Sequence, residues 1–257
     1  MATSKIEEAP VTEQISQTTQ DTLLGGRVAI VQPKDGYRVA IDPVLLAASI
    51  QPAAGDSILD VGAGTGAVSL CLAARCPETT ISGLELNEQY CAWATRSAAL
   101  NGLTIGFHHG DLFSLPNALR GQLFNFVLSN PPYWSPDSSR PASPSRSGAH
   151  FLDGVSLTDW VRQCLALLQN GGVLSLVLPA EKLEEALGAL AGTAGGVKVF
   201  PLWARAGEPA KRIILQAKKQ SKAPLRLYAG LSLHAADGSF TTTARHVLND
   251  GSPLSIA

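Results

Sequence analysis

The residues best suited to chemistry form the tetrapeptide Asn130-Pro131-Pro132-Tyr133, which follows an apolar run at 124–129. Consecutive prolines fix the backbone and remove amide donors, so the asparagine is held extended and the tyrosine leaves a rigid bend. A simple turn at the end of a strand would need neither an amide side chain nor an aromatic ring. The pattern therefore favours the rigid presentation of polar groups and one aromatic ring to a ligand.

A second candidate is the glycine-rich run at 57–66, S-I-L-D-V-G-A-G-T-G, which precedes an apolar-periodic stretch at 67–74. Its first residues predict a short buried parallel strand, and the stretch after it predicts a helix. Gly62, Gly64 and Gly66 allow a ligand close to the backbone, and the helix start adds amide donors and a positive dipole end. We expect a small charged or polar cofactor here. Gly62, Gly64 and Ala67 also fit the dinucleotide fingerprint, so the loop alone leaves the cofactor open.

Three carboxylates accompany this loop. Asp60 lies inside the first strand, and Glu85 ends the strand predicted at 80–84. A carboxylate ~20 residues beyond such a loop is where a doubly wound fold meets a ribose diol. Asp111 follows the strand predicted at 104–109. It could accept a hydrogen bond from an adenine amine or cap the following turn.

Strands and helices alternate after the loop, which predicts an α/β fold with a parallel, doubly wound sheet. The predicted helices cover 67–74, 88–100, 155–168 and 180–191. The predicted strands are 58–61, 80–84, 104–109, 124–129, 173–178, 197–200 and 212–216.

The N-terminal part is expected to differ. Residues 1–21 are polar with little to bury, so they predict a disordered tail. Residues 22–54 predict an extension with strands at 28–31 and 37–41 around a Pro/Asp-Gly turn. A helix follows, with Asp42 as N-cap and Pro43 at its first position. The functional alternative places Asp42 and Arg38 over the polar end of the cofactor.

The net charge of −1 and a pI of about 6.5 give no global field toward nucleic acid, so any such binding needs a local basic patch. One candidate stands near the C-terminal strands, with Glu208 as its single acid. It is either a solvated face or a phosphate-contacting patch. A predicted long mobile loop at 137–150, beside the site, adds Arg140 and Arg146. The patch comprises Arg205, Lys211, Arg212, Lys218 and Lys219, extended by Lys222 and Arg226.

The cysteines show no metal-type spacing, which predicts small buried thiols in a reduced cytoplasmic protein and no metal site. The start of the chain lacks a basic region followed by an apolar run, and no segment reaches ~18 consecutive apolar residues. We therefore expect a cytoplasmic location and no membrane partner. The cysteines are Cys71, Cys76, Cys91 and Cys164.

The glycine loop, Glu85, Asp111 and the Asn-Pro-Pro-Tyr tetrapeptide, in this order, resemble the class I S-adenosylmethionine-dependent methyltransferases over roughly 57–216. The tetrapeptide is similar to that of enzymes that methylate a planar amide-like or exocyclic nitrogen. The flanks at 36–47 and 205–212 resemble the bacterial family that methylates the exocyclic N6 of adenine in the anticodon loop of a valine tRNA. The resemblance implies a seven-stranded, mostly parallel, Rossmann-like methyltransferase domain at 55–257 behind a short hairpin and helix extension.

The resemblance also implies roles. Asn130, through its side-chain oxygen, and Pro131, through its carbonyl, would accept hydrogen bonds from the target amine, and Tyr133 would stack on the base. Asn130 would also border the cofactor, S-adenosylmethionine. For the cofactor itself, the glycines would pass under the methionine part, Asp60 would orient the ammonium, Glu85 the ribose and Asp111 the adenine. The implied partner is RNA, with tRNA first among RNAs.

Two other hypotheses stay open at this point. The motif is shared with methyltransferases that act on a protein glutamine in translation factors. Those enzymes carry a larger helical N-terminal domain, whereas the segment predicted before Ser57 is short and partly strand-like. The chain could also be a non-catalytic, cofactor-binding partner subunit. An intact Asn130 and Tyr133 argue against that reading.

Overall fold

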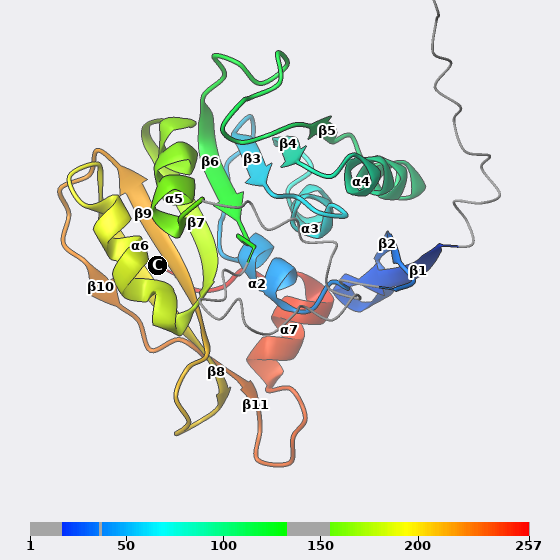
Figure 1. Ribbon diagram of the computed structural model, residues 1–257. Helices are drawn as coiled ribbons and strands as arrows, with labels where there is room; N and C mark the ends of the chain where they lie inside the picture. The colour runs from blue at the N-terminus through cyan, green and yellow to red at the C-terminus, as the bar shows by residue number, and fades with distance from the viewer. Residues whose placement is uncertain (1–16, 36–37, 133–154, 257) are drawn as a thin grey trace, which may run out of the picture.

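The computed structural model describes residues 17–35, 38–132 and 155–256, which form a twisted sheet with helices on both faces (Figure 1). Tyr133 and the loop predicted at 137–150, with Arg140 and Arg146, lie outside the described residues.

The central part of the sheet is parallel and doubly wound. From β3 the chain moves to β4 and β5 on one side, and then crosses back to β6 and β7 on the other. The point where this order reverses lies between β3 and β6, which is where such sheets bind ligands. The bounds are β3 (Ser57–Val61), β4 (Thr80–Glu85), β5 (Gly106–His109), β6 (Phe124–Ser129) and β7 (Leu168–Pro179).

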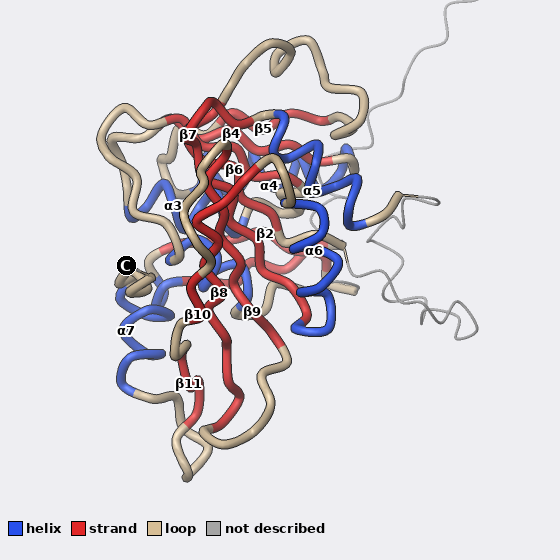
Figure 2. The backbone as a smooth tube through the Cα atoms, turned by 90° about the vertical axis from the view of Figure 1, so that its left-hand side faces the viewer, coloured by secondary structure: helices blue, strands red, loops and turns tan. Residues whose placement is uncertain are grey.

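The sheet continues with antiparallel and edge strands. β9 (Arg212–Lys219) runs antiparallel between β7 and β8 (Ala194–Arg205), which completes the seven predicted strands. Two short strands, β10 (Arg226–Leu227) and β11 (Leu231–His234), then pair one after the other with the outer side of β8 (Figure 2). The sheet therefore has nine strands where seven were expected. Sequence periodicity missed the two because alternation over only two or four residues is too short to identify a strand.

Alternate strand residues face two separate cores, as the two-residue period of a strand requires. Ile58 and Ile214 face one core, and Leu59 and Leu215 face the other. The first core is covered by α2 (Asp42–Ala48), α3 (Ala67–Arg75), α4 (Glu88–Leu100) and α7 (Thr242–Asp250). The second is covered by α5 (Leu157–Ala166) and α6 (Leu183–Leu190), which follows the 3-10 turn η3 (Ala180–Lys182).

The N-terminal hairpin differs from the prediction. β2 (Val28–Pro33) pairs with β1 (Thr18–Leu23), which lies before it, and not with residues 38–41. Residues 18–21 are thus in a strand, although a disordered tail was predicted there. The chain reverses at η1 (Leu24–Gly26), where all three residues have positive φ (50°, 64° and 95°). The sequence of β1 is polar and shows no hydrophobic pattern. The strand forms because its backbone pairs with β2, which a hydrophobic pattern does not reveal.

The helix start at Asp42 also differs. The N-cap is Ile41, Asp42 is the first helical residue, and no side chain caps the helix. The Asp42 carboxylate instead accepts from Nε of Arg212, at 3.3 Å, at the start of β9. The predicted capping role is therefore wrong. An arginine distant in sequence lies where it can pair with this carboxylate, and the acid still favours the helix N-terminus electrostatically.

Candidate active site

The carboxyl ends of the parallel strands bring the predicted residues to one edge. Val61 of β3 pairs in register with Ser129 of β6, and Glu85 of β4 pairs with His109 of β5. The glycine turn follows Val61, Asn130 follows Ser129, and Asp111 comes two residues after His109. The structure therefore places the glycine turn, Glu85, Asp111 and Asn130 along the same edge.

The glycine turn leaves one side open. Gly62, Gly64 and Gly66 have φ of 72°, 56° and 89°, which L side chains rarely adopt. A Cβ on Gly66 would lie 2.8 Å from the Phe107 ring, so this glycine lets α3 pack on β5. A Cβ on Gly64 would meet no described atom within 4 Å. Gly64 is thus the glycine over which a ligand has room, and the cradle fits a cofactor.

Glu85 holds this turn in place. Its Oε2 accepts the Gly64 amide at 2.7 Å, and its Oε1 accepts the Asn87 amide at 2.8 Å. The carboxylate therefore ties the middle of the glycine turn to the end of β4. Each carboxylate oxygen can accept more than one hydrogen bond, so a ribose hydroxyl remains compatible with this arrangement.

Asp60 lies beneath the turn and is 1% exposed. Its Oδ2 accepts the hydroxyl of Ser69 at 2.8 Å and the amide of Ser69 at 3.2 Å, in the first turn of α3. Burial raises the pKa of the Asp60 carboxyl to about 7, the charge of Glu85 adds to the rise, and the Ser69 hydrogen bonds oppose it. The carboxyl is therefore poised to respond to a positive charge brought to the turn.

Asp111 serves the local turn in this structure. Its Oδ1 accepts the amide of Phe113 at 2.9 Å, which is the turn-capping alternative. The Phe113 ring, 38% exposed, is among the exposed large apolar side chains. The adenine-binding role of Asp111 stays a prediction.

Asn130 is the unusual residue of the edge. Its Oδ1 is buried, yet no described residue donates a hydrogen bond to it. Leaving a buried acceptor unpaired costs about 1–3 kcal/mol, so native structures rarely keep one without a reason. A neutral acceptor of this kind suits an amine N–H. Pro131, which follows, is buried.

Two residues that the sequence analysis did not single out lie between the glycine turn and Asn130. Ser129 donates from its hydroxyl to the Val61 carbonyl at 2.7 Å, and the Trp160 indole Nε1 donates to the Ser129 hydroxyl at 3.1 Å. A serine at the buried end of an apolar strand was the only sequence signal for this link.

The predicted basic patch is not one surface. Arg212 pairs with Pro179 at the end of β7, on the edge that carries Asn130, whereas Lys218 pairs with Val173, six residues earlier. At ~3.3 Å per strand residue, the two ends lie roughly 20 Å apart. Three of the cations also have partners within the protein: Lys219 donates to the Leu168 carbonyl, Arg205 lies 3.6 Å from Glu208, and Arg212 pairs with Asp42. The length of β9 therefore separates two clusters of cations that are neighbours in the sequence.

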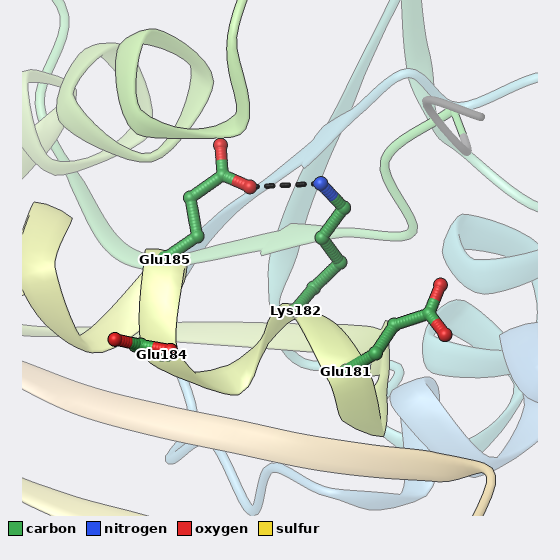
Figure 3. Close-up of a pocket in the computed structure, with 4 residues that line it drawn as sticks. All are labelled: Glu181, Lys182, Glu184 and Glu185. Atoms are coloured by element: carbon green, nitrogen blue, oxygen red, sulfur yellow. Dashed lines mark hydrogen bonds and ion pairs between the residues drawn. The ribbon is translucent and has the colours of Figure 1, made fainter. Parts of the chain in front are cut away.

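A cavity on η3 and α6 has a different chemistry (Figure 3). It is lined by Lys182, which pairs with Glu185 at 2.9 Å, together with Glu181 and Glu184. Three acids against one lysine do not suit a polyanion, and none of the predicted site residues lines the cavity. We therefore assign the site to the glycine-turn edge. Among the described residues, no group of three potential metal ligands comes together. No helix in the same ranges is both long and apolar enough to cross a membrane.

The fold and this edge define a class I S-adenosylmethionine-dependent methyltransferase. The methyltransferase small domain family matches residues 38–199, and the chain belongs to this family. A predicted O-methyltransferase from Agrobacterium tumefaciens has a similar structure, with a TM-score of 0.69 and 27% identity over 83% of this chain and 98% of that one. A 16S rRNA methyltransferase from T. thermophilus, solved with AdoMet and guanosine, shares the fold at 20% identity, with a TM-score of 0.56 over 79% of this chain and 50% of that one.

Related sequences carry a more specific name. A tRNA1(Val) (adenine(37)-N6)-methyltransferase from Actinobacillus pleuropneumoniae is 31% identical over 82% of this chain and 89% of its own length. One of the same name from Porphyromonas gingivalis is 31% identical over 58% of this chain. The matched region spans 61–65% of the length of four such relatives, from P. gingivalis, Pseudoalteromonas translucida and Vibrio campbellii.

Proposed function

We propose that this protein transfers a methyl group from S-adenosylmethionine to the exocyclic N6 amine of an adenine in tRNA. The observation that supports this most directly is the buried, unpaired Oδ1 of Asn130 at the strand end next to the glycine turn. The names of the related proteins point to the same reaction. A tRNA substrate also implies a cytoplasmic location.

When bound, the cofactor supplies a methyl group on a sulfonium, which is an electrophile. The adenine amine is a poor nucleophile because its lone pair is delocalised into the ring. Two acceptors, Asn130 Oδ1 and the Pro131 carbonyl, would favour the pyramidal amine, in which the lone pair is free to attack. Transfer forms the N–C bond and breaks the S–C bond, so the donor would leave as a neutral thioether. No strong base is required, because the amine would lose its proton after transfer, when its positive charge makes it acidic enough for water to accept the proton. Holding the two reactants in line supplies much of the remaining rate.

The cofactor would lie over the open side of Gly64. Glu85, which already holds the Gly64 amide, would accept from the ribose, and the buried Asp60 would favour the ammonium at the start of α3. Asp111 would meet the adenine. Tyr133 would stack on the substrate base, an interaction typically worth ~1–3 kcal/mol.

The RNA would contact the site edge first. Lys211 and Arg212 precede and begin β9 beside the end of β7, close to the edge with Asn130. Lys218 and Lys219 lie at the far end of the same strand, so they would meet a different part of a large RNA. Arg205, at the end of β8, belongs to the first group.

The test is methyl transfer from labelled cofactor to total bacterial tRNA, with the nucleosides identified by mass spectrometry. N6-methyladenosine is expected as the labelled product. Absence of label from every RNA would reject the proposal, and label in a protein fraction would favour the glutamine reaction. Asn130→Ala should lower the rate of labelling about 10²–10³-fold, whereas the matched control Asn117→Ala, on an exposed loop, should retain it.

A further inference from the structure

A chain of hydrogen bonds joins the two halves of the candidate site. The Trp160 indole N–H donates to the Ser129 hydroxyl, which in turn donates to the Val61 carbonyl. Val61 immediately precedes the glycine turn, and Ser129 immediately precedes Asn130. All three residues are at least 95% buried, so water does not compete for these bonds.

The Trp160 ring also lies next to the turn. A Cβ placed on Gly62 would lie 3.5 Å from one carbon of the indole and 3.7 Å from the next. Gly62 and the ring are therefore separated by a space that one methyl group would fill. One side chain thus lies beside the start of the glycine turn and holds the strand end before Asn130 through its N–H.

The start of α5 holds this tryptophan in place. Ser156 and Asp159 form a capping box, in which the Ser156 hydroxyl accepts the Asp159 amide at 3.1 Å and the Ser156 amide donates back to the Asp159 carboxylate. The next residue is Trp160, whose own amide donates to the Ser156 carbonyl at 3.1 Å. A capped first turn is rigid, so the indole has a defined position.

We infer that Trp160 is a positioning residue, which sets the spacing between the glycine turn that holds the methyl donor and the Asn130 oxygen that holds the amine. The role rests on the proposed function, because it presumes a reaction between groups bound at these two places. It acts through Ser129. The Ser129 hydroxyl donates its single hydrogen bond to the Val61 carbonyl, and its oxygen accepts a hydrogen bond from the indole N–H. Without the indole donor, the Ser129 hydroxyl is free to rotate. Because Ser129 directly precedes Asn130, the position of Asn130 is then less well fixed.

Such a shift should lower the rate without weakening binding, since misplacement by ~1 Å can cost about 100-fold in rate. We expect Trp160→Phe, which keeps a buried aromatic ring but lacks the N–H, to slow single-turnover methylation of tRNA about 10-fold. The KM for tRNA, the Kd for the cofactor and the melting temperature should stay close to those of the wild type.

The matched control is Trp93→Phe. Trp93 is also buried, at 7% exposed, but it lies on α4 and takes no part in the hydrogen bonds that join Trp160, Ser129 and Val61, so its replacement should leave the rate unchanged. If Trp160→Phe does not fold, Ser129→Ala takes its place, because it removes the same link by a smaller change. The double variant should be no slower than the slower single variant, because both remove the same link. Equal rates for Trp160→Phe and Trp93→Phe, or additive losses in the double variant, would overturn the inference.

A second measurement does not require the substrate to be known. The chain has four tryptophans, and Trp160 lies beside the glycine turn. Titration with S-adenosylhomocysteine should change the tryptophan fluorescence of the wild type and of Trp93→Phe, and most of the change should be lost in Trp160→Phe. A change that persists in Trp160→Phe contradicts the placement. A wild type that binds the cofactor but does not methylate tRNA refutes the proposed function and not this placement.

Discussion

The two sides of the candidate site differ in how their polar groups are satisfied. On the glycine-turn side, Glu85 and Asp60 already accept amides of the turn and of the following helix, from Gly64 and Ser69. On the strand-end side, the Asn130 Oδ1 is buried with no donor among the described residues. The first side is therefore organised before any ligand binds, and the second awaits a donor from outside.

This difference suits the two sides to different ligands, the cofactor on one side and the substrate on the other. Preorganised donors and acceptors bind a ligand without reordering the protein, which suits a cofactor shared by many reactions. An unpaired acceptor discriminates strongly between substrates. A substrate that lacks the matching N–H leaves the buried oxygen without a hydrogen bond, and its desolvation is then not offset. Substitutions on each side test this contrast.

The largest effect should come from Asn130→Ala. We expect methylation to fall by about 10²–10³-fold, the range found when one preorganised polar group is removed from an active site. The cofactor Kd should change less than about 2-fold, and the melting temperature should not fall, because no hydrogen bond within the described residues is lost. Activity assays, calorimetry and thermal melting measure the three quantities. A loss of cofactor affinity as large as the loss of rate would erase the contrast between the two sides.

Glu85→Gln should show the opposite pattern. The amide side chain keeps an oxygen for one backbone donor but loses the charge and the second acceptor, so the cofactor Kd should rise about 10-fold. At saturating cofactor the rate should fall much less. Glu88→Gln, an exposed residue in the first turn of α4, is the matched control and should leave the Kd unchanged. An unaltered Kd in Glu85→Gln would remove this residue from the cofactor site.

The buried Asp60 predicts how stability depends on pH. Its pKa is raised from an ordinary 3.8 to about 7, so between these values the folded protein binds a proton that the unfolded chain releases. The free energy of unfolding should therefore fall as pH rises through this range, and level off above about pH 7. Denaturation curves at several pH values measure this, with Asp60→Asn as the non-titrating control. A difference between the two proteins that does not change with pH would contradict the shift.

The same carboxyl predicts how cofactor binding depends on pH. A cationic ammonium near Asp60 favours the charged carboxylate, so affinity for S-adenosylmethionine should rise several-fold between about pH 5.5 and about pH 7. Methylthioadenosine, which lacks the ammonium, is the control ligand and should bind with little dependence on pH. Parallel curves for the two ligands in calorimetry would place the ammonium away from Asp60.

The smallest effect concerns the RNA surface. Lys211→Glu, beside the site edge, should weaken tRNA binding a few-fold and reduce the salt slope by about 1. Lys218→Glu, at the other end of β9, should weaken the binding of full-length tRNA more than the binding of an isolated anticodon stem-loop, because the far cluster lies roughly 20 Å along the strand from the site edge and would meet a part of the RNA outside the anticodon. Filter binding across a salt series gives both numbers. Equal effects of Lys218→Glu on both RNAs would place the far cluster at the anticodon.

Local signals predicted most of the site. The glycines at positive φ, the acid at the end of β4 and the asparagine before two prolines all depend on neighbours within a few residues. Strand periodicity then placed these residues at strand ends, and parallel pairing brings strand ends together at one edge. For this reason the sequence alone predicted the class of fold, its seven core strands and the edge at which the candidate site residues meet.

Tertiary structure decided the pairings between distant segments. The contact of Asp42 with Arg212, the hairpin of β1 with β2, the division of the basic patch and the link from Trp160 to Ser129 carry no periodic signal. Each depends on which strands become neighbours and on which face a side chain lies. Sheet order sets both, and it emerges only when the whole core packs, because burial and pairing act between residues that are far apart in the chain.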